Sequence, residues 1–351
     1  MNAVLIIDKP SGLTSHDVVN RARRILGERS IGHLGTLDPM ATGVLPLVIG
    51  RLTRLAQFYT NAEKTYEGTI RFGFSTDTYD AEGQPTSAPQ PVTLNPDQIQ
   101  SLAAGFRGVI EQVPPPFSAK KIQGVPAYKL ARKQKEVVLK PVQVEIKEFE
   151  ILSVDPDRVH FRARVASGTY MRSVAHEMGQ ALSCGAHLES LRRTTVAEFT
   201  LADAHTLDEL ATHCHCHCHP DHHDSHPDQP PICHSDRSCS FPQGKGSAVE
   251  GSAVPASANE VPPKDPAHNL ESLFVHPRKL LPQLPSVTAD EATAARIRTG
   301  RTINLPELSR ARQVKVFSGQ RDLIAIATRV AGSLFHPKIV LTGSEIPVHS
   351  S

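Results

Sequence analysis

The sequence predicts an α+β fold in which strands outnumber helices and pair mainly antiparallel. Short runs of alternating apolar and polar residues recur along the chain and favour strands with one buried face. Fewer segments carry apolar residues at helical spacing, and these are mixed with the strands. The length of 351 residues fits about two domains.

The first part of the chain predicts two strands around a capped helix. Residues 4–8 form a short apolar run that we expect to be a strand. Thr14 and Asp17 have the spacing of a capping box, and Gly27 can end the helix that this box opens. A glycine-rich loop follows, and the apolar run 44–49 predicts the second strand.

In the middle of the chain, segments with strand-like alternation are mixed with segments that have helical spacing of apolar residues. The predicted elements are a short helix near 52–60, strands at 66–74, 142–146 and 159–165, and helices at 99–106 and 171–182. The triplet Ser167-Gly168-Thr169 breaks the strand before the last of these helices, and Gly185 stops that helix.

Composition divides the chain into three predicted parts. Residues 212–268 have almost no large apolar side chain, so this segment cannot bury enough surface to offset the entropy of ordering. We expect a main domain at 1–211, a disordered insert at 212–268 and a small tail module at 269–351. The tail predicts a helix at 291–299 and strands at 313–317, 323–330 and 339–341.

Charge is spread unevenly, although the net charge is only +2. Residues 107–147 contain nine Lys or Arg and three Glu, which gives +6. Residues 278–351 contain eleven Lys or Arg and five Asp or Glu, which also gives +6. Two basic segments fit either a long polyanionic partner or two solvated faces.

The sequence predicts a cytoplasmic protein. The first residues have no basic region followed by a long apolar stretch, so we expect no signal peptide. No segment approaches the ~20 apolar residues that span a bilayer. Five of the six cysteines lie between 214 and 239 beside histidines, which is not the pattern of a disulfide framework.

The segment GHLGTLDPMATG, residues 32–43, places a single carboxylate, Asp38, among three glycines. Glycine permits a close approach of the backbone to another group, and Asp-Pro is a common turn pair. The loop alone fits either a tight turn in which Asp38 caps an amide or an acid exposed for chemistry. It is not a P-loop, because no Lys-Ser or Lys-Thr follows the last glycine.

Several segments in a fixed order carry a resemblance that covers about residues 3–205. They are DKPSGLTSHD (8–17), the loop 32–43, KTYEGTIRFG (64–73), STDTYDAEG (75–83), QVPPPFSAKKIQGVPAYKLAR (112–132), SGTYMRS (167–173) and GAHLESLRRT (185–194). Together they closely resemble the TruB family of tRNA pseudouridine synthases. The resemblance implies a pseudouridine synthase fold, and the tail more weakly resembles a PUA-like RNA-binding domain. It also implies an isomerase without a cofactor, which converts uridine 55 in the T-loop of tRNA to pseudouridine.

The same resemblance implies roles for five residues. Asp38 matches the catalytic aspartate, and Arg172 matches the arginine that pairs with it and favours its ionised form. Tyr66 matches the tyrosine that stacks on the target base, and Leu191 matches a leucine packed near that base. His33 matches the histidine placed against the RNA when the uridine is flipped into the pocket. Taken singly, these side chains are more typical of turn, surface or core positions than of a catalytic site.

Phosphate contacts that supply affinity and salt dependence are also implied. The candidates are Lys9, Lys120, Lys121, Arg132, Arg192 and Arg193. Three positions depart from the family pattern: Leu34 where threonine is expected, Glu177 where aspartate is expected, and Ser183 where glycine is expected. None of these departures removes a proposed catalytic group.

A tract rich in histidine and cysteine does not match the family. Residues 212–239 contain eight His and five Cys, including the run His213, Cys214, His215, Cys216, His217, Cys218 and His219. Imidazoles and thiolates suit zinc, copper or nickel, but this alternation is not a zinc-finger spacing. Adventitious metal binding, an inert insert and a regulatory metal site all stay open, and the predicted reaction requires no metal.

The prediction is a stand-alone tRNA pseudouridine-55 synthase that recognises the T-arm and acts as a monomer, without a membrane or an obligate protein partner. Three alternatives stay open: a guide-RNA-dependent rRNA modifier, a non-catalytic RNA-binding protein on the same scaffold, and a metal-handling protein. The chain lacks the long basic extensions of the guide-dependent class. The set Asp38, Tyr66 and Arg172 favours catalysis over binding alone.

Overall fold

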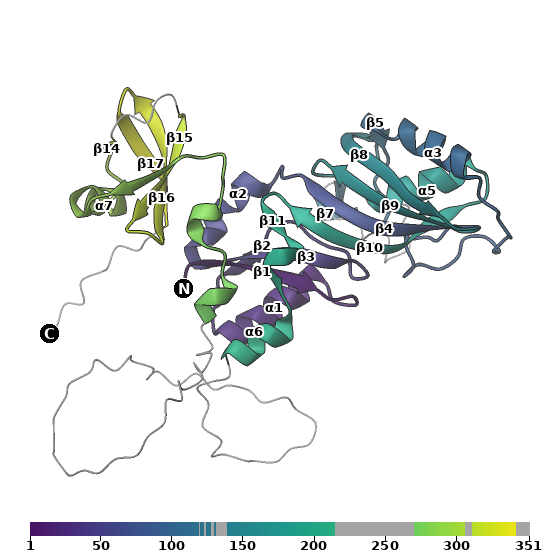
Figure 1. The fold of residues 1–351 in the computed structure, drawn as a ribbon, viewed down its shortest axis with the longest axis horizontal. Helices are drawn as coiled ribbons and strands as arrows, with labels where there is room; N and C mark the ends of the chain where they lie inside the picture. The colour runs from purple at the N-terminus through teal and green to yellow at the C-terminus, as the bar shows by residue number, and fades with distance from the viewer. Residues whose placement is uncertain are drawn as a thin grey trace, which may run out of the picture.

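The computed structural model describes residues 1–118, 120–122, 124–127, 130, 139–214, 270–305 and 311–341. Its largest feature is a ten-stranded sheet (Figure 1). The strands run in the order β12 (Ala204–His205), β1 (Ala3–Lys9), β3 (Thr42–Ile49), β10 (Ala186–Val196), β4 (Lys64–Phe72), β9 (Arg158–Val165), β8 (Val142–Val154) and β5 (Gly108–Gln112). In addition, β2 (Ile31–His33) pairs with β3, and β11 (Phe199–Thr200) pairs with β10.

The predicted fold class is confirmed. Most neighbouring strands are antiparallel, whereas β1 pairs with β12 and β10 pairs with β3 in parallel, so the sheet is mixed. The helical elements that accompany this sheet are α1 (Ser15–Leu26), η1 (Gly50–Leu55), α2 (Ala56–Tyr59), α3 (Pro96–Gly105), α5 (Met171–Ala181), η2 (Leu201–Asp203) and α6 (Leu207–Cys214). One apolar cluster joins α1, α3, α5 and α6 to β1, β3, β4, β8, β9 and β10.

Local signals place α1 where the sequence predicts it. The Thr14 hydroxyl accepts a hydrogen bond from Asp17 N at 3.1 Å, and the Asp17 carboxylate accepts one from Thr14 N at 2.9 Å. Together they satisfy two backbone donors that a helix start leaves unpaired. Gly27 caps the other end in the left-handed conformation, with φ of +63°. The predicted capping box and helix stop are confirmed.

No strand is predicted at residues 186–196, yet β10 lies in the centre of the sheet between β3 and β4. Its pairing with β4 is irregular between Leu188 and Ser190 and again between Arg193 and Thr195. A bulge adds an extra residue to one strand and so interrupts the alternation of apolar and polar residues from which a strand is predicted. The chain's central strand therefore has no alternating pattern.

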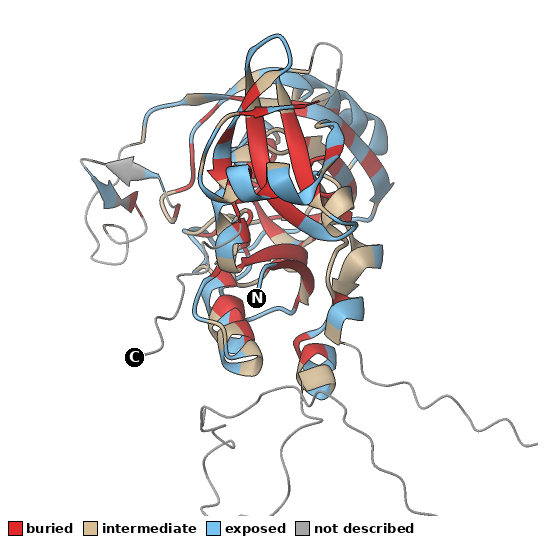
Figure 2. Ribbon diagram, turned by 90° about the vertical axis from the view of Figure 1, so that its left-hand side faces the viewer, coloured by how far each residue is buried: buried red, intermediate tan, exposed pale blue. Residues whose placement is uncertain are grey.

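The tail forms a second, five-stranded sheet with one helix. Its elements are β13 (Ser286–Ala289), α7 (Glu291–Arg298), β14 (Ile303–Asn304), β15 (Gln313–Ser318), β16 (Asp322–Ala331) and β17 (Leu334–Val340). The predicted helix and the first two predicted strands are confirmed. The third strand exists but begins at Leu334, five residues before the predicted start, and the short strands β13 and β14 are additional. Seen from the tail side, Figure 2 shows buried strands in this sheet. Its own apolar cluster includes Val314, Val316 and Phe335.

The tail packs directly on the main domain, and the two share an apolar cluster. That cluster includes Val4 and Ile6 of β1 together with Leu281 and Phe317 of the tail. Val275 N donates a hydrogen bond to Val4 O at 2.8 Å, which fixes the connection against β1. The tail is therefore held in one orientation by buried apolar surface, whose removal from water is the main favourable term in such packing.

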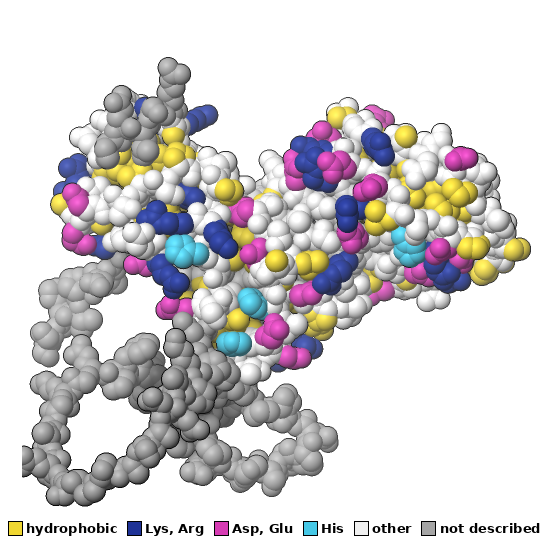
Figure 3. All heavy atoms as spheres, in the orientation of Figure 1, with side chains coloured by type: hydrophobic (Ala, Val, Ile, Leu, Met, Phe, Trp, Pro, Cys, Tyr) yellow, Lys and Arg dark blue, Asp and Glu magenta, His cyan; other side chains and the backbone are white. Residues whose placement is uncertain are grey.

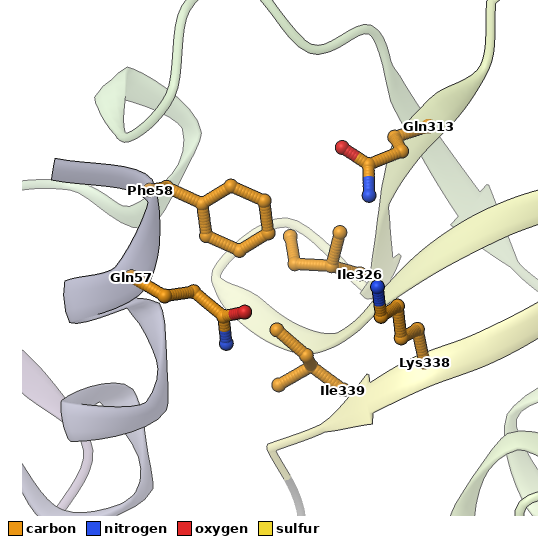
Figure 4. A pocket seen from close by; sticks show the side chains of 6 residues that line it. All are labelled: Gln57, Phe58, Gln313, Ile326, Lys338 and Ile339. Carbon is orange, nitrogen blue, oxygen red and sulfur yellow. The ribbon is translucent and has the colours of Figure 1, made fainter. Parts of the chain in front are cut away.

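A cavity of about 220 Å³ lies between α2 and the tail sheet (Figure 4). Its lining residues are Gln57, Phe58, Gln313, Ile326, Lys338 and Ile339. None of the residues predicted to be catalytic lines it.

The predicted insert lies largely outside the described residues. Helix α6 continues past the predicted boundary at 211 and ends at Cys214. Residues 215–269 are outside the described part of the chain, and with them most of the histidine-cysteine tract. No helix in the described ranges is long and apolar enough to cross a membrane.

Candidate active site

Asp38 lies in the loop between β2 and β3, and the start of α1 holds that loop. The Ser15 hydroxyl accepts a hydrogen bond from Leu37 N at 2.8 Å and donates one to Leu37 O at 3.1 Å. After the acid, Gly43 has φ of +99°, and a Cβ there would lie 2.2 Å from the carbonyl oxygen of Arg193. A side chain at this position is excluded, because β3 and β10 meet there backbone to backbone.

Arg193 supports the Asp38 loop from inside the protein. Its side chain is fully buried, and its Nε donates to Val44 O at 2.8 Å. Its two terminal nitrogens donate to Thr36 O at 3.3 Å and to Gly35 O at 3.0 Å. The predicted phosphate contact at Arg193 is therefore wrong: the guanidinium has no exposed surface, and backbone carbonyls occupy its donors.

The same correction applies to Lys9. Its side chain is fully buried, and its ammonium donates to Pro10 O at 2.9 Å, Leu13 O at 2.6 Å and Pro39 O at 3.0 Å. Three carbonyls use the three protons that an ammonium can donate. Burial lowers the pKa of Lys9 to about 8, against the opposing attraction of Glu82. Lys9 ties the Asp38 loop to the end of β1 and is not available to RNA.

The second residue of α5, Arg172, reaches Asp38 from a distant part of the sequence. Its Nη2 donates a hydrogen bond to Asp38 Oδ1 at 3.1 Å, and its Nε lies 3.0 Å from Oδ2. The contact has two points: a hydrogen bond from Nη2, and a close approach of opposite charges at Nε. The Arg172 side chain is 5% exposed and that of Asp38 is 35% exposed. One side of the carboxylate is thus paired, while the other remains open to solvent.

Three further acceptors hold the guanidinium of Arg172. Its Nη1 donates to Thr78 O at 3.2 Å and lies 3.4 Å from Asp80 Oδ2, and its Nη2 donates to Phe117 O at 3.1 Å. The Asp80 side chain is itself buried, at 4% exposure. Asp80 is not among the predicted site residues, although the segment 75–83 is one of the family motifs. In the sequence, Asp80 is one acidic residue in a turn-rich segment, where acidic residues are common, so nothing local distinguishes it.

The electrostatic surroundings change the ionisation of Asp38. Burial raises the pKa of this carboxyl above its ordinary value, and the nearby Asp80 charge adds to the rise. The Arg172 guanidinium opposes the rise, and so does Lys9. An ionised carboxylate with a raised pKa is a stronger base and nucleophile than an ordinary aspartate.

The other residues implied by the resemblance lie on the elements around this loop. Tyr66 in β4 is mostly buried and accepts a hydrogen bond from Arg193, its cross-strand neighbour. Leu191 of β10 packs in the main apolar cluster. His33 ends β2 and is half-buried, and burial lowers its pKa, with Arg193 adding to the effect. Arg193 thus links Tyr66 to the backbone of the Asp38 loop.

The remaining basic candidates differ in their surroundings. Arg192 is 42% exposed, and its two terminal nitrogens contact the Asp8 carboxylate at 2.7 and 3.1 Å. Lys120 is exposed. Lys121 begins the short strand β6 (Lys121–Ile122), which pairs with β7 (Val125–Pro126), and Arg132 lies outside the described residues. Arg192 and Lys120 are therefore placed where a phosphate can reach them.

The three departures from the family pattern are accommodated locally. Leu34 is buried in the cluster shared with the tail. Glu177 accepts a hydrogen bond from the backbone of Val113. Ser183 has φ of +54°, a left-handed conformation that glycine adopts without strain, which fits the glycine expected there.

In the described part of the chain, no group of three or more His, Cys, Asp or Glu side chains is placed to hold a metal ion. His213 and Cys214 end α6. The run from His215 to His219 lies outside the described residues, so the structure does not bear on the predicted metal tract.

Comparison with known proteins agrees with this architecture. The model of the TruB family pseudouridylate synthase N-terminal domain matches residues 23–171, and that of the tRNA pseudouridylate synthase B C-terminal domain matches residues 172–225. A protein of Solibacter usitatus named tRNA pseudouridine synthase B is 43% identical over 344 residues, covering 97% of this chain and 100% of the relative. One from Opitutus terrae with the same name is 47% identical over 210 residues, covering 60% of this chain and 87% of the relative.

A solved structure shares the fold. In the crystal structure of the archaeal box H/ACA sRNP Nop10-Cbf5 complex, the matched chain aligns with a TM-score of 0.61 and 22% identity. The alignment covers 98% of this chain and 87% of the other. The two family matches, the long relative and a carboxylate paired to a buried arginine agree: this chain belongs to the TruB family of pseudouridylate synthases, which are isomerases.

Proposed function

We propose that the chain is a tRNA pseudouridine-55 synthase that isomerises the T-loop uridine of tRNA. The observation that carries this proposal is the carboxylate of Asp38, which Arg172 holds at two points while its other side stays open. The relatives named tRNA pseudouridine synthase B support tRNA as the substrate.

The reaction rearranges bonds within one nucleotide. The bond between N1 of uracil and C1′ of ribose breaks, the base turns, and a bond between C5 and C1′ forms. The proton that leaves C5 goes to solvent, and N1 gains one, so substrate and product are isomers. The sum involves no oxidation or reduction, and we therefore expect no redox cofactor. Asp38 acts as the nucleophile that makes this exchange possible.

The surrounding residues have separate tasks in this proposal. Arg172 favours the ionised form of Asp38 and fixes its orientation. Tyr66 and Leu191 line the place of the flipped base, and His33 lies against the RNA from which the base has moved. Flipping costs a few kcal/mol of unstacking, which contacts with the extruded base offset.

The other parts of the proposal concern the whole chain. We take residues 1–211 as the catalytic domain and residues 269–351 as a PUA-like RNA-binding module. Residues 278–351 of this module carry a net charge of +6, which favours binding to the same polyanionic substrate. Arg192 and Lys120 are the described candidates for phosphate contacts. We expect a cytoplasmic monomer that needs no guide RNA and no obligate protein partner.

Tritium release from a tRNA transcript labelled at C5 of uridine tests the reaction. The wild type releases label from the T-loop uridine, and Asp38→Asn, which keeps the shape but not the charge, reduces release by at least about 1,000-fold, or ~4 kcal/mol. Arg162→Gln on the exposed sheet face serves as the matched control for a lost charge. Absence of release by the wild type without guide RNA contradicts the proposal, and equal release by Asp38→Asn removes Asp38 as the nucleophile.

A further inference from the structure

Three consecutive residues of the loop 75–83 contact α5 at two positions one helical turn apart. Thr78 O accepts from Nη1 of Arg172 at 3.2 Å, and Asp80 Oδ2 lies 3.4 Å from the same nitrogen. Between them, the ring of Tyr79 stacks on the imidazole of His176, with centroids 3.8 Å apart and planes 8° from parallel. Arg172 and His176 are four residues apart and therefore lie on the same face of the helix.

The loop turns sharply at Tyr79 itself. Its φ of +65° is in the left-handed region, which is uncommon for an aromatic residue. This turn directs the carbonyl before it and the carboxylate after it towards one nitrogen of Arg172. The Asp80 carboxylate is further fixed by the Thr78 hydroxyl at 2.5 Å and by Glu82 N at 3.1 Å. A disfavoured turn of this kind persists only where its surroundings stabilise it.

The stacked rings add a second contact from α5 to this turn, beside that of Arg172, while Leu188 N of β10 donates a hydrogen bond to Tyr79 O at 3.0 Å. Tyr79 and His176 are both half-buried. Burial lowers the pKa of His176, so its imidazole is neutral near pH 7. Burial and the neighbouring Glu177 raise the pKa of the Tyr79 phenol, so this ring is neutral as well. Near pH 7 the contact is therefore one between two neutral rings, stacked face to face.

We propose that Tyr79 and His176 form a clamp that sets the plane of the Arg172 guanidinium against Asp38, and that both are positioning residues for the isomerisation. The guanidinium has two sides: the loop holds Nη1, and Nη2 and Nε face the two oxygens of Asp38. If the loop moves, the charge of Arg172 remains but its fork no longer matches the carboxylate. The inference rests on the proposed reaction at Asp38.

The test uses the full chain and C5-tritiated tRNA transcript, with three variants of Tyr79. Tyr79→Ala reduces kcat about tenfold, or ~1.4 kcal/mol, and leaves KM within about twofold. Tyr79→Phe keeps the stack and the wild-type rate. Tyr79→Gly adopts the left-handed turn without strain but has no ring, so it separates the turn from the stack. We expect it to be as slow as Tyr79→Ala.

His176→Ala completes the test from the other side of the stack. It reduces kcat as Tyr79→Ala does, and the double variant is no slower than the slower single variant, because both remove one contact. In Tyr79→Ala and Tyr79→Gly, the acid limb of kcat/KM moves to higher pH, since Asp38 loses part of its contact with Arg172. Thermal unfolding of each variant shows whether a loss of rate comes from unfolding. If Tyr79→Ala does not fold, Tyr79→Gly and His176→Ala provide the same test.

Three outcomes overturn the clamp while the wild type is active. The first is a wild-type rate in Tyr79→Gly. The second is a change confined to KM in the Tyr79 variants, which would make Tyr79 an RNA contact. The third is a slow variant whose acid limb of kcat/KM lies at the wild-type pH. A wild type that releases no tritium overturns the proposed reaction itself, and the two failures are thus distinguishable.

Discussion

Carboxylates and guanidinium groups pair in two very different regions of this protein. Around Asp38, the Arg172 side chain is 5% exposed and contacts two acids and two backbone carbonyls. On the open face of β4, β8 and β9, Arg162 is 51% exposed and lies 2.8 Å from Glu67. Figure 3 shows basic and acidic side chains interspersed over this part of the sheet. The chemical groups are the same in both regions, and the difference between them is the burial of the side chains.

The difference shows what burial adds to an ion pair. Two exposed charged groups that pair give up contacts with water of about the same strength as the attraction they gain. Exposed ion pairs therefore contribute little to the free energy of unfolding. A buried guanidinium has lost its hydration, and every donor that lacks an acceptor costs free energy. The buried region therefore requires defined geometry, which a catalytic carboxylate also needs.

Among the variants that compare the two regions, the largest effect should come from Arg193, a buried arginine that donates to backbone carbonyls. Arg193→Gln leaves the carbonyls of Val44, Thr36 and Gly35 without their donors, and we expect a loss of about 3 kcal/mol in the free energy of unfolding. Urea denaturation measures it. The matched control is the adjacent Arg192→Gln, which removes a 42% exposed side chain. Equal losses in the two variants would show that burial does not distinguish these neighbours.

Activity should respond next most strongly to Arg172. Arg172→Gln removes the charge and the fork that face Asp38, and we expect kcat to fall about 100-fold, or ~2.7 kcal/mol. Arg172→Lys keeps the charge without the fork, so its rate should lie between those of Arg172→Gln and the wild type. Steady-state tritium release measures all three. A wild-type rate in Arg172→Lys would mean that charge alone is sufficient.

The pH dependence sharpens the comparison further. Burial raises the pKa of Asp38, and the reaction needs its ionised form, so kcat/KM should fall as the pH falls through a value above the ordinary aspartate range. Arg172 opposes this rise; in Arg172→Gln the acid limb should therefore move to higher pH. The pH profiles of the two proteins provide the measurement. An acid limb at the same pH in both proteins would show that it does not report the ionisation of Asp38.

The smallest effect is expected on the exposed face. Arg162→Ala removes the contacts with Glu67, and we expect neither the urea midpoint nor the rate of tritium release to change measurably. The companion Glu67→Ala, which breaks the same contacts from the other side, should behave alike. A clear loss in either variant would show that the exposed pairs act as a network.

Patterns that depend on neighbours in sequence were predictable. The capping box at Thr14 and Asp17, the apolar strand after the Asp38 loop and the tail helix all follow from local hydrogen bonds or periodicity. The bulged strand β10 was not predictable, because its apolar residues do not alternate. For the site, the motifs supplied Asp38 and Arg172 but not Asp80, whose role depends on where its loop lies.

By itself the sequence determined the fold class, the helix boundaries set by caps and the family motifs that surround Asp38. Only the tertiary structure decided which basic residues are available: Lys9 and Arg193 are buried against backbone carbonyls, whereas the side chain of the adjacent Arg192 is 42% exposed. The physical reason is the range of the interactions. Caps and strand periodicity act over a few residues, but burial and the contact between Asp38 and Arg172 depend on segments that meet only when the chain has folded.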